Sequence, residues 1–260
     1  MDFIGLRYPL MEKNNSVKIN IFETEAEVIE SVALYFVTIA RQAISERGKC
    51  SVALSGGNSP KRLYELLSSP AFKDKIEWQK LDFFFGDERY VPKEDSQSNY
   101  RMARETLFAP LTIEPTHIFA IDTTLQPEQA AEKYEADIRN CFGNNPILFD
   151  IILLGLGNNA HTASLFPHTC VLNDTTSSVK AVFLEDQKVY RITFTAPLIN
   201  NARNIAFLVY GKTKAIAVQQ VIEGKRDIQN SPAQLIAPFT GQLQWFLDKA
   251  AGAGIQTNFY

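Results

Sequence analysis

The chain has 260 residues, 45% of them hydrophobic and 21% charged, which is the composition of an ordinary globular protein with a substantial core. Twenty-six basic and 29 acidic residues give a formal charge of −3, which excludes a broad positive field for gripping nucleic acid or an anionic membrane. Three widely spaced cysteines without a CxxC pair imply neither a disulfide framework nor a zinc site. Met1–Asn15 does not have the pattern of a leader, and the sequence contains no apolar run of about 18 residues that could span a membrane. We therefore expect a cytoplasmic protein with a single domain over residues 1–260.

The first half of the chain is predicted to alternate strands and helices. Val17–Phe22 has the composition of a strand. A long helix is predicted after it, because Thr24 and Glu27 have the spacing of a capping box, apolar residues follow at helical spacing, and Gly48 offers a stop. Further strands are expected at Cys50–Ser55, Leu81–Gly86, His117–Ile121 and Phe149–Leu154, and further helices at Pro60–Ser68, Ser96–Phe108 and Pro127–Cys141.

The second half continues the alternation. Val179–Leu184 and Val189–Thr195 are predicted as paired strands and Asn204–Tyr210 as another strand, while Lys212–Glu223 and Gly241–Ala250 are predicted as helices. Strands that alternate with helices require crossover connections. The predicted fold class is therefore α/β, a doubly wound, mainly parallel, Rossmann-like sheet with helices on both faces.

The most informative motif is the loop after the apolar run Phe149–Leu154. The run ends at Gly155 and Gly157, as a central strand of a parallel sheet would, and such sheets bind ligands just beyond the carboxyl ends of their strands. His161 lies on this loop, and histidine, with an ordinary pKa of about 6.5, exchanges protons near neutrality. The loop predicts a general base; the alternative is a histidine packed against a turn.

A second loop joins a predicted strand to a predicted helix and contains Ser55, Gly56, Gly57 and Asn58. Two glycines allow the backbone to approach a ligand closely, and Pro60 suits the first turn of the next helix. The free N–H groups and the positive dipole end of that helix form a natural seat for phosphate. The loop is neither a Walker loop nor GxGxxG, and a tight connection without a ligand is the alternative.

Three charged residues, Asp87, Glu88 and Arg89, follow the predicted strand Leu81–Gly86. An arginine at the end of a sheet can clamp an oxyanion with two hydrogen bonds, and carboxylates can orient it or hold hydroxyl groups of a substrate. The alternative is a solvated turn with an internal ion pair.

Two more cations point to an anionic ligand. Arg191 lies in a predicted strand with apolar neighbours, and Lys214 lies in the first turn of a predicted helix, where the helix dipole disfavours a cation unless an anion is bound. The alternatives are a surface lysine and an arginine that extends to solvent.

Taken together, these segments resemble the 6-phosphogluconolactonase family over nearly the whole chain. The matching blocks, in chain order, are Ser55-Gly56-Gly57 with Pro60, Gly86-Asp87-Glu88-Arg89 with Val91-Pro92 and Ser98-Asn99-Tyr100, His161-Thr162-Ala163-Ser164-Leu165-Phe166-Pro167, Arg191-Ile192-Thr193, Ser231-Pro232-Ala233-Gln234-Leu235 and Trp245-Phe246-Leu247-Asp248. The family is related in fold to glucosamine-6-phosphate deaminases.

The resemblance implies hydrolysis of 6-phospho-D-glucono-1,5-lactone to 6-phosphogluconate, in the pentose phosphate pathway, without a metal or an organic cofactor. It implies that His161 activates the attacking water, and Asp87 is assigned with it to the catalytic residues. Phosphate is expected on the Ser55-Gly56-Gly57 loop with Asn58, Arg89, Arg191 and Lys214. The only partner expected is this small sugar phosphate, with no nucleic acid or membrane, and the protein is expected to be a monomer.

The chain departs from the family at one sensitive place, where Asn159-Ala160 replaces the usual Asp-Gly before the histidine. An amide in place of a carboxylate removes a negative charge that raises the pKa of a neighbouring imidazole and stabilises its cation. If the usual glycine has positive φ, alanine costs about 1 kcal/mol or moves the loop.

Two other functions remain open. An isomerase or deaminase acting on an amino-sugar phosphate requires further acid–base groups, but no carboxylate follows His161 before Asp174. A sugar-phosphate-binding protein without catalysis is favoured only by Asn159 and Ala160.

Overall fold

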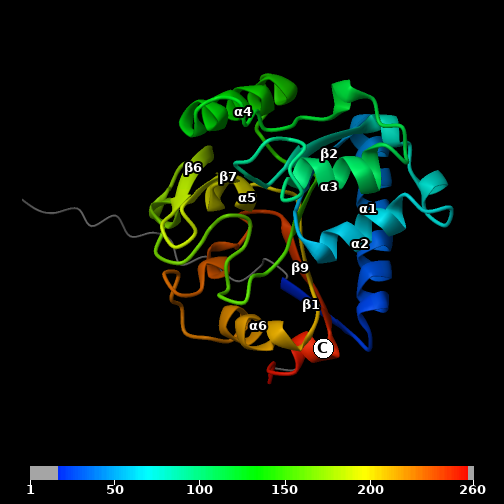
Figure 1. Ribbon diagram of the computed structural model, residues 1–260. Coiled ribbons are helices and arrows are strands. Elements are labelled where there is room, and N and C mark those ends of the chain that lie inside the picture. The colour runs from blue at the N-terminus through cyan, green and yellow to red at the C-terminus, as the bar shows by residue number, and fades with distance from the viewer. Residues whose placement is uncertain (1–16, 257–260) are drawn as a thin grey trace, which may run out of the picture.

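The computed structural model describes residues 17–256 and arranges their strands in a six-stranded parallel sheet and a three-stranded antiparallel sheet (Figure 1). The larger sheet has the spatial order β1-β9-β8-β5-β2-β3. Its strands are β1 (Val17–Phe22), β2 (Cys50–Leu54), β3 (Leu81–Phe85), β5 (Ile151–Leu154), β8 (Asn204–Val209) and β9 (Gln242–Asp248). The segment Met1–Asn15, in which we expect no leader, lies outside the described residues.

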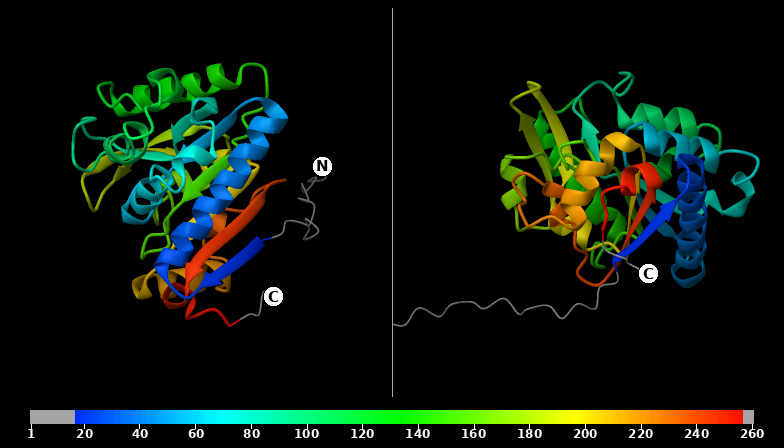
Figure 2. Two further views of the ribbon diagram at one scale, coloured as in Figure 1. Left: turned by 90° about the vertical axis from the view of Figure 1, so that its right-hand side faces the viewer. Right: turned by 90° about the horizontal axis from the view of Figure 1, so that it is seen from below.

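Helices cover both faces of the larger sheet, which confirms the predicted α/β class. In Figure 2, α1 runs along one face, with α2 packed against it, and the antiparallel sheet and α6 lie on the other side. The helices are α1 (Glu25–Arg47), α2 (Asn58–Leu67), α3 (Asn99–Ala103), α4 (Pro127–Phe142), α5 (Ala196–Asn200), α6 (Ala215–Ile222) and α7 (Lys249–Gly252). Short 3-10 turns are η1 (Lys73–Lys75), η2 (Trp78–Lys80), η4 (Pro115–His117), η5 (Cys170–Asn173), η6 (Lys212–Lys214) and η7 (Pro232–Leu235), and η3 (Arg104–Phe108) is a π-helical turn.

The central strands β2, β3 and β5 are buried along their whole length, because both faces of the sheet are covered. Their parallel register places Leu54 beside Phe85, and Ala53 beside Ile152. The three carboxyl ends therefore lie at the same edge of the sheet. The loops that follow Leu54, Phe85 and Leu154 meet there.

Helix α1 has the boundaries that its sequence predicts. Thr24 accepts a hydrogen bond from the backbone N–H of Glu27, whose carboxylate accepts from the N–H of Glu23, and Gly48 ends the helix with a φ of 78°. The helix is long and apolar enough to pass a test for a membrane span, but 56% of the tested window is buried within the protein. A core helix of a globular domain has this property.

The antiparallel sheet consists of β4 (Asp87–Arg89), β7 (Val189–Phe194) and β6 (Val179–Leu184), in that order. Strand β3 leads directly into β4 through Gly86, whose carbonyl accepts a hydrogen bond from the N–H of Phe194. The chain thus passes from one sheet to the other at the edge where the loops meet.

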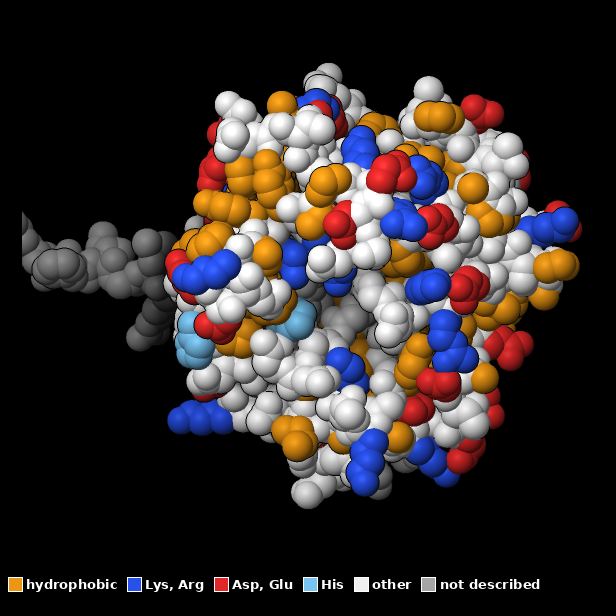
Figure 3. Space-filling model, viewed as in Figure 1, with side chains coloured by type: hydrophobic (Ala, Val, Ile, Leu, Met, Phe, Trp, Pro, Cys, Tyr) orange, Lys and Arg blue, Asp and Glu red, His pale blue; other side chains and the backbone are white. Residues whose placement is uncertain are grey.

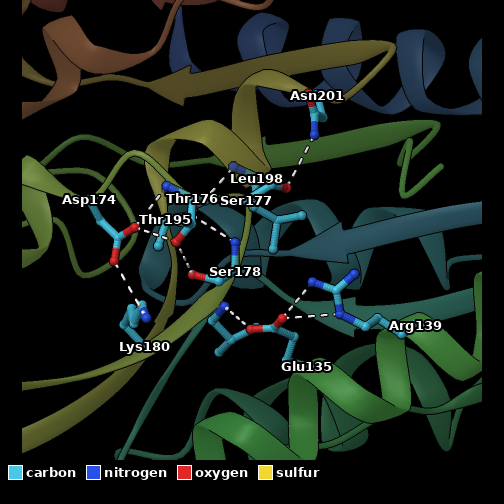
Figure 4. A network of polar contacts seen from close by, with 11 residues as sticks. Glu135, Arg139, Asp174, Thr176, Ser177, Ser178, Lys180, Thr195, Leu198 and Asn201 are labelled. Carbon is cyan, nitrogen blue, oxygen red and sulfur yellow. Dashed lines mark hydrogen bonds and ion pairs between the residues drawn. The ribbon is translucent and has the colours of Figure 1, made fainter.

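A polar network fixes the start of β6 (Figure 4). The carboxylate of Glu135 on α4 accepts a hydrogen bond from the N–H of Val179, at 3.2 Å. Thr195, which caps α5, accepts from the N–H of Ser178 and donates to the carbonyl of Thr176. These contacts hold the β6–β7 hairpin against α4 and α5.

The prediction of a helix at Gly241–Ala250 is wrong. The segment forms strand β9 between β1 and β8, and the short helix α7 follows it. Trp245, Phe246 and Leu247 are all buried between the covering layers. Pairing with two neighbouring strands decides the conformation of this short apolar run, which has no helical periodicity long enough to oppose it.

Two smaller expectations also need correction, and one strand was not expected. The predicted strand His117–Ile121 is mainly irregular, since η4 ends at His117 and only Ile118 forms a bridge, to Phe83. The helix predicted from Ser96 begins at Asn99 and becomes π-helical at Arg104. Strand β4 was not predicted, because its partner β7 is remote in the sequence.

Candidate active site

A pocket of about 260 Å³ lies at the carboxyl ends of β2, β3, β5 and β8. Figure 3 shows it as a hollow bordered by Lys and Arg side chains and by a histidine. All nine predicted site residues line it: Ser55, Gly56, Gly57, Asn58, Asp87, Arg89, His161, Arg191 and Lys214. A larger groove of about 930 Å³, between α3, η4 and α4, contains none of them.

The loop between β2 and α2 presents the start of a helix to the pocket. Gly57 has a φ of 101°, and no side chain caps α2, so the N–H groups of its first turn are free of a side-chain partner. The buried hydroxyl of Tyr64 accepts from the N–H of Ser55 and donates to its carbonyl, which fixes the loop. A Cβ on Gly56 would come within 1.9 Å of Oδ1 of Asn99, so no larger residue fits there without moving that side chain.

The ladder between β4 and β7 carries the charged residues. Asp87 pairs with Thr193, and Arg89 pairs with Arg191, so the four side chains share one face of the small sheet. Like charges directly opposite on neighbouring strands are unfavourable. The two arginines therefore gain from an anion between them.

Asp87 is buried and held by neutral donors. Its Oδ2 accepts from the hydroxyl of Ser164 at 2.7 Å, and its Oδ1 and carbonyl accept from the side-chain amide of Asn99, at 3.4 and 2.9 Å. Asp87 is the one carboxylate among the described residues that line the pocket.

Glu88, by contrast, faces away from the pocket and has a structural role. Its carboxylate accepts from the N–H groups of Asn99 and Tyr100 and from the hydroxyl of Ser98, and so caps α3. Burial raises the pKa of Glu88, although these backbone donors oppose the rise. Glu88 therefore acts by fixing the backbone at Asn99, whose side chain holds Asp87.

His161 lies in the tight loop after β5. The N–H of Gly157 donates to the carbonyl of His161, and the N–H of Ala160 donates to the carbonyl of Gly157. Ala160 is fully buried with a φ of 58°, so alanine occupies a left-handed conformation that glycine adopts more readily. The imidazole stacks on Phe166, with 3.9 Å between ring centroids.

The site around His161 is positively charged. Burial and, after it, the charges of Lys214, Arg191 and Arg89 lower the pKa of His161 from 6.5 to about 4. Burial also lowers the pKa values of Lys214 and, together with the facing Arg89, of Arg191. The imidazole is therefore neutral at physiological pH.

The three cations have no carboxylate partner within 4 Å among residues 17–256. Arg89 donates to the carbonyl of Gln97, and Arg191 donates to the side chain of Gln187. Half-buried cations without counter-ions are costly. An anionic ligand would offset that cost.

Several residues that shape the pocket have no role that the sequence predicts. Asn99 and Ser164 hold Asp87, and Phe166 stacks on His161. All three occur in the motifs that carry the family resemblance, but nothing in the sequence shows which side chain each of them contacts. Tyr210 also lines the pocket, at the end of β8.

Comparisons with known proteins all point to one family. A family model described as glucosamine-6-phosphate isomerases/6-phosphogluconolactonase matches residues 23–245. The chain is 39% identical over 244 residues to the 6-phosphogluconolactonase of Synechocystis sp., covering 92% of this chain and 98% of that one. It is 40% identical over 215 residues to the 6-phosphogluconolactonase of Nostoc sp., covering 81% and 87%.

Solved structures agree with the sequence relatives. The 6-phosphogluconolactonase from Trypanosoma brucei matches with a TM-score of 0.83 at 28% identity, covering 93% of this chain and 100% of that one. A monomeric glucosamine-6-phosphate deaminase matches with a TM-score of 0.78 at 20% identity, which is a likeness of fold alone.

Proposed function

The chain belongs to the glucosamine-6-phosphate isomerase/6-phosphogluconolactonase family, and we propose that His161 activates the water molecule with which the protein hydrolyses 6-phospho-D-glucono-1,5-lactone. The observation that carries the proposal is a neutral histidine beside three cations without carboxylate partners, in a pocket at the carboxyl edge of the sheet. A lactone that bears a phosphate needs these two elements, a base and an anion site.

The phosphate is assigned to the N-terminus of α2 and the three cations. The Ser55-Gly56-Gly57 loop and Asn58 would donate hydrogen bonds to it, and Arg89, Arg191 and Lys214 would neutralise its charge. These contacts hold the far end of the substrate and leave its lactone carbonyl beside the loop of His161.

The reaction is a general-base hydrolysis. His161 takes a proton from water as the water oxygen attacks C1, and the carbonyl electron pair moves to oxygen to form a tetrahedral oxyanion. When that pair returns, the bond between C1 and the ring oxygen breaks, and the imidazolium returns the proton to that oxygen. The products are the carboxylic acid and a hydroxyl group at C5.

Asp87 is proposed as the second catalytic residue. Its carboxylate lines the pocket and is oriented by Ser164 and Asn99. An ionised carboxylate only accepts hydrogen bonds, so its proposed role is to orient a hydroxyl of the sugar or the attacking water. A sugar phosphate is the proposed small-molecule partner, without nucleic acid or membrane, for a cytoplasmic, monomeric protein of one domain.

An isomerase or deaminase is less well supported. Moving protons between two carbons needs acid–base groups in addition to His161. Among the described residues that line the pocket, the one carboxylate is Asp87, which is held by Ser164 and Asn99. The next carboxylate in the chain, Asp174, accepts hydrogen bonds from Thr176 and pairs with Lys180 in the network of Figure 4, and it does not line the pocket.

The test is an assay of lactone hydrolysis, corrected for the spontaneous rate, on the wild type and on His161→Asn. We expect the variant to lose about 10²- to 10⁴-fold in kcat, the usual contribution of a positioned base, and to bind 6-phosphogluconate as before. If the wild type binds 6-phosphogluconate but does not exceed the spontaneous rate at any pH, the protein is a sugar-phosphate binder and the proposal fails.

A further inference from the structure

The imidazole of His161 is constrained on three sides within its own loop. Phe166 stacks on the ring at an interplanar angle of 18°. A Cβ on Gly157 would lie 2.0 Å from Nδ1 and 2.1 Å from Cε1, so the backbone of Gly157 closes off that side. Nδ1 lies 2.5 Å from Oδ1 of Asn159. Nε2 has no hydrogen-bond partner among the described residues.

We propose that Asn159 is a positioning residue that fixes the tautomer of His161: its amide oxygen accepts the Nδ1–H of the neutral imidazole, and Nε2 is left unprotonated to take a proton from water. A neutral imidazole carries one proton, so the group that contacts Nδ1 decides which nitrogen is the base. Asn159 does this without the negative charge that a carboxylate would bring. The inference extends the role proposed for His161 and rests on it.

The orientation of the amide is the critical step, because asparagine can present either its oxygen or its NH₂ group. An NH₂ group facing Nδ1 would donate to it, and the proton would move to Nε2 and block the base. Asn159 is exposed, so its NH₂ group can be hydrated by solvent when the oxygen faces inward. The cations nearest to His161, Lys214, Arg191 and Arg89, also favour the negative end of the amide dipole on the inner side.

The charges around His161 are then all positive except one. Lys214 approaches from η6, Arg191 from β7 and Arg89 from β4, and the carboxylate of Asp87 is occupied by Ser164 and Asn99. Asn159 adds no charge from the loop itself. The imidazolium formed during the reaction therefore has no carboxylate from its own loop beside it.

The first experiment reads the tautomer directly, without using activity. The chain has three histidines, so long-range ¹H–¹⁵N spectra of the labelled protein at pH 7 resolve His161, with His161→Gln for the assignment. We expect the proton on Nδ1. A proton on Nε2 would overturn the proposal, even if the protein were an active lactonase. A proton on Nδ1 in an inactive protein would support it and reject only the catalytic role.

The second experiment compares three variants in their kcat–pH profiles. Asn159→Asp keeps an acceptor and adds a charge, so the acid limb should move up by about 1–2 pH units while the plateau stays within about 10-fold. Asn159→Leu has a similar shape and no acceptor, and it should lower the plateau about 2- to 10-fold with little change in KM. Asn158→Asp, which adds the same charge to the exposed side of the turn, is the matched control and should move the limb by less than about half a unit.

The aspartate variant also separates the two amide orientations. If the wild type presented its NH₂ group to Nδ1, Asn159→Asp would release the trapped tautomer and raise the plateau by up to about 10⁴-fold, the scale of the loss when an amide traps a catalytic histidine in the wrong tautomer. Such a gain, or a plateau unchanged in Asn159→Leu, would overturn the proposal.

Discussion

Replacing Lys214 by glutamine should raise the pKa of His161. After burial, the charge of Lys214 is the largest cause of the lowered pKa of His161. Lys214 occupies the residue before α6 and has no carboxylate partner among residues 17–256. Glutamine removes the charge and keeps most of the length of the side chain. Lys214→Arg keeps the charge and is the matched control.

The size of the effect follows from the pKa of about 4 in the folded protein. At pH 5, about 90% of His161 is then neutral, whereas an ordinary histidine with a pKa of 6.5 would be only about 3% neutral. The wild type should therefore keep its base in the working form well below neutral pH. Lys214→Gln should lose part of this acid tolerance, and its KM should rise because an anion contact is missing.

The free energy of unfolding also depends on the protonation of His161. Folding lowers the pKa of His161, so the unfolded chain takes up the proton first as the pH falls from about 6.5 to about 4. Over that window the wild type loses up to about 3 kcal/mol of unfolding free energy from this group, at 1.36 kcal/mol for each pKa unit. Lys214→Gln should lose less unfolding free energy over the same pH window, because the pKa of His161 in its folded state is closer to 6.5.

The assay is a titration of the His161 imidazole by NMR, combined with urea unfolding at pH 7 and pH 5. We expect His161 of the wild type to remain neutral at pH 5 and its midpoint to rise in Lys214→Gln but not in Lys214→Arg. A wild-type midpoint near 6.5, or equal midpoints in the wild type and Lys214→Gln, would refute the reasoning.

Three further substitutions, at Gly56 and Ala160, test the backbone of the site. Gly56→Ala places a Cβ 1.9 Å from Oδ1 of Asn99, so we expect the Asn99 side chain to move away from Asp87. The main effect should be a lower kcat for the lactone rather than a lower Tm. An Asn99 side chain that has not moved in a crystal structure of the variant would contradict this. Ala160→Gly relieves about 1–2 kcal/mol of left-handed strain, which stabilises the folded state. Two losses oppose this gain: a buried methyl group, about 0.8 kcal/mol, and the greater chain entropy of glycine in the unfolded state, about 0.4–1 kcal/mol. The terms nearly cancel, so the Tm should change by no more than about 2–4 °C. Ala160→Val, with a branched side chain at positive φ in a buried position, should lower the Tm much more, and equal melting of the two variants would argue against the left-handed conformation.

Local sequence signals predicted the parts of the fold that local interactions decide. The start and end of α1 follow from Thr24, Glu27 and Gly48, and the buried strands β2, β3 and β5 follow from short, mainly apolar runs that lead to glycines. Those endings also placed the site, because the carboxyl ends of parallel strands share one edge. The helix expected at Gly241–Ala250 failed because its conformation depends on pairing with β1 and β8, which no local pattern contains.

Within the site, residue types were predictable and contacts were not. The sequence indicated a histidine base and several cations, but the pairing of Arg89 with Arg191 depends on a register between strands about 100 residues apart. The contact between Asn159 and Nδ1 depends on the left-handed turn at Ala160. Both features arise from the folded backbone, and the motifs show only which residues take part.

The opposed arginines link folding to occupancy of the site. Two arginines directly opposite each other on neighbouring strands repel, and a bound oxyanion reduces this repulsion, so the folded state gains stability whenever such an anion is bound. At a concentration 100 times its Kd, a ligand that binds only the folded state adds about 2.7 kcal/mol. Inorganic phosphate, 6-phosphogluconate and the lactone would then all protect the chain, and a melting temperature measured in phosphate buffer would describe a partly liganded protein rather than the empty one.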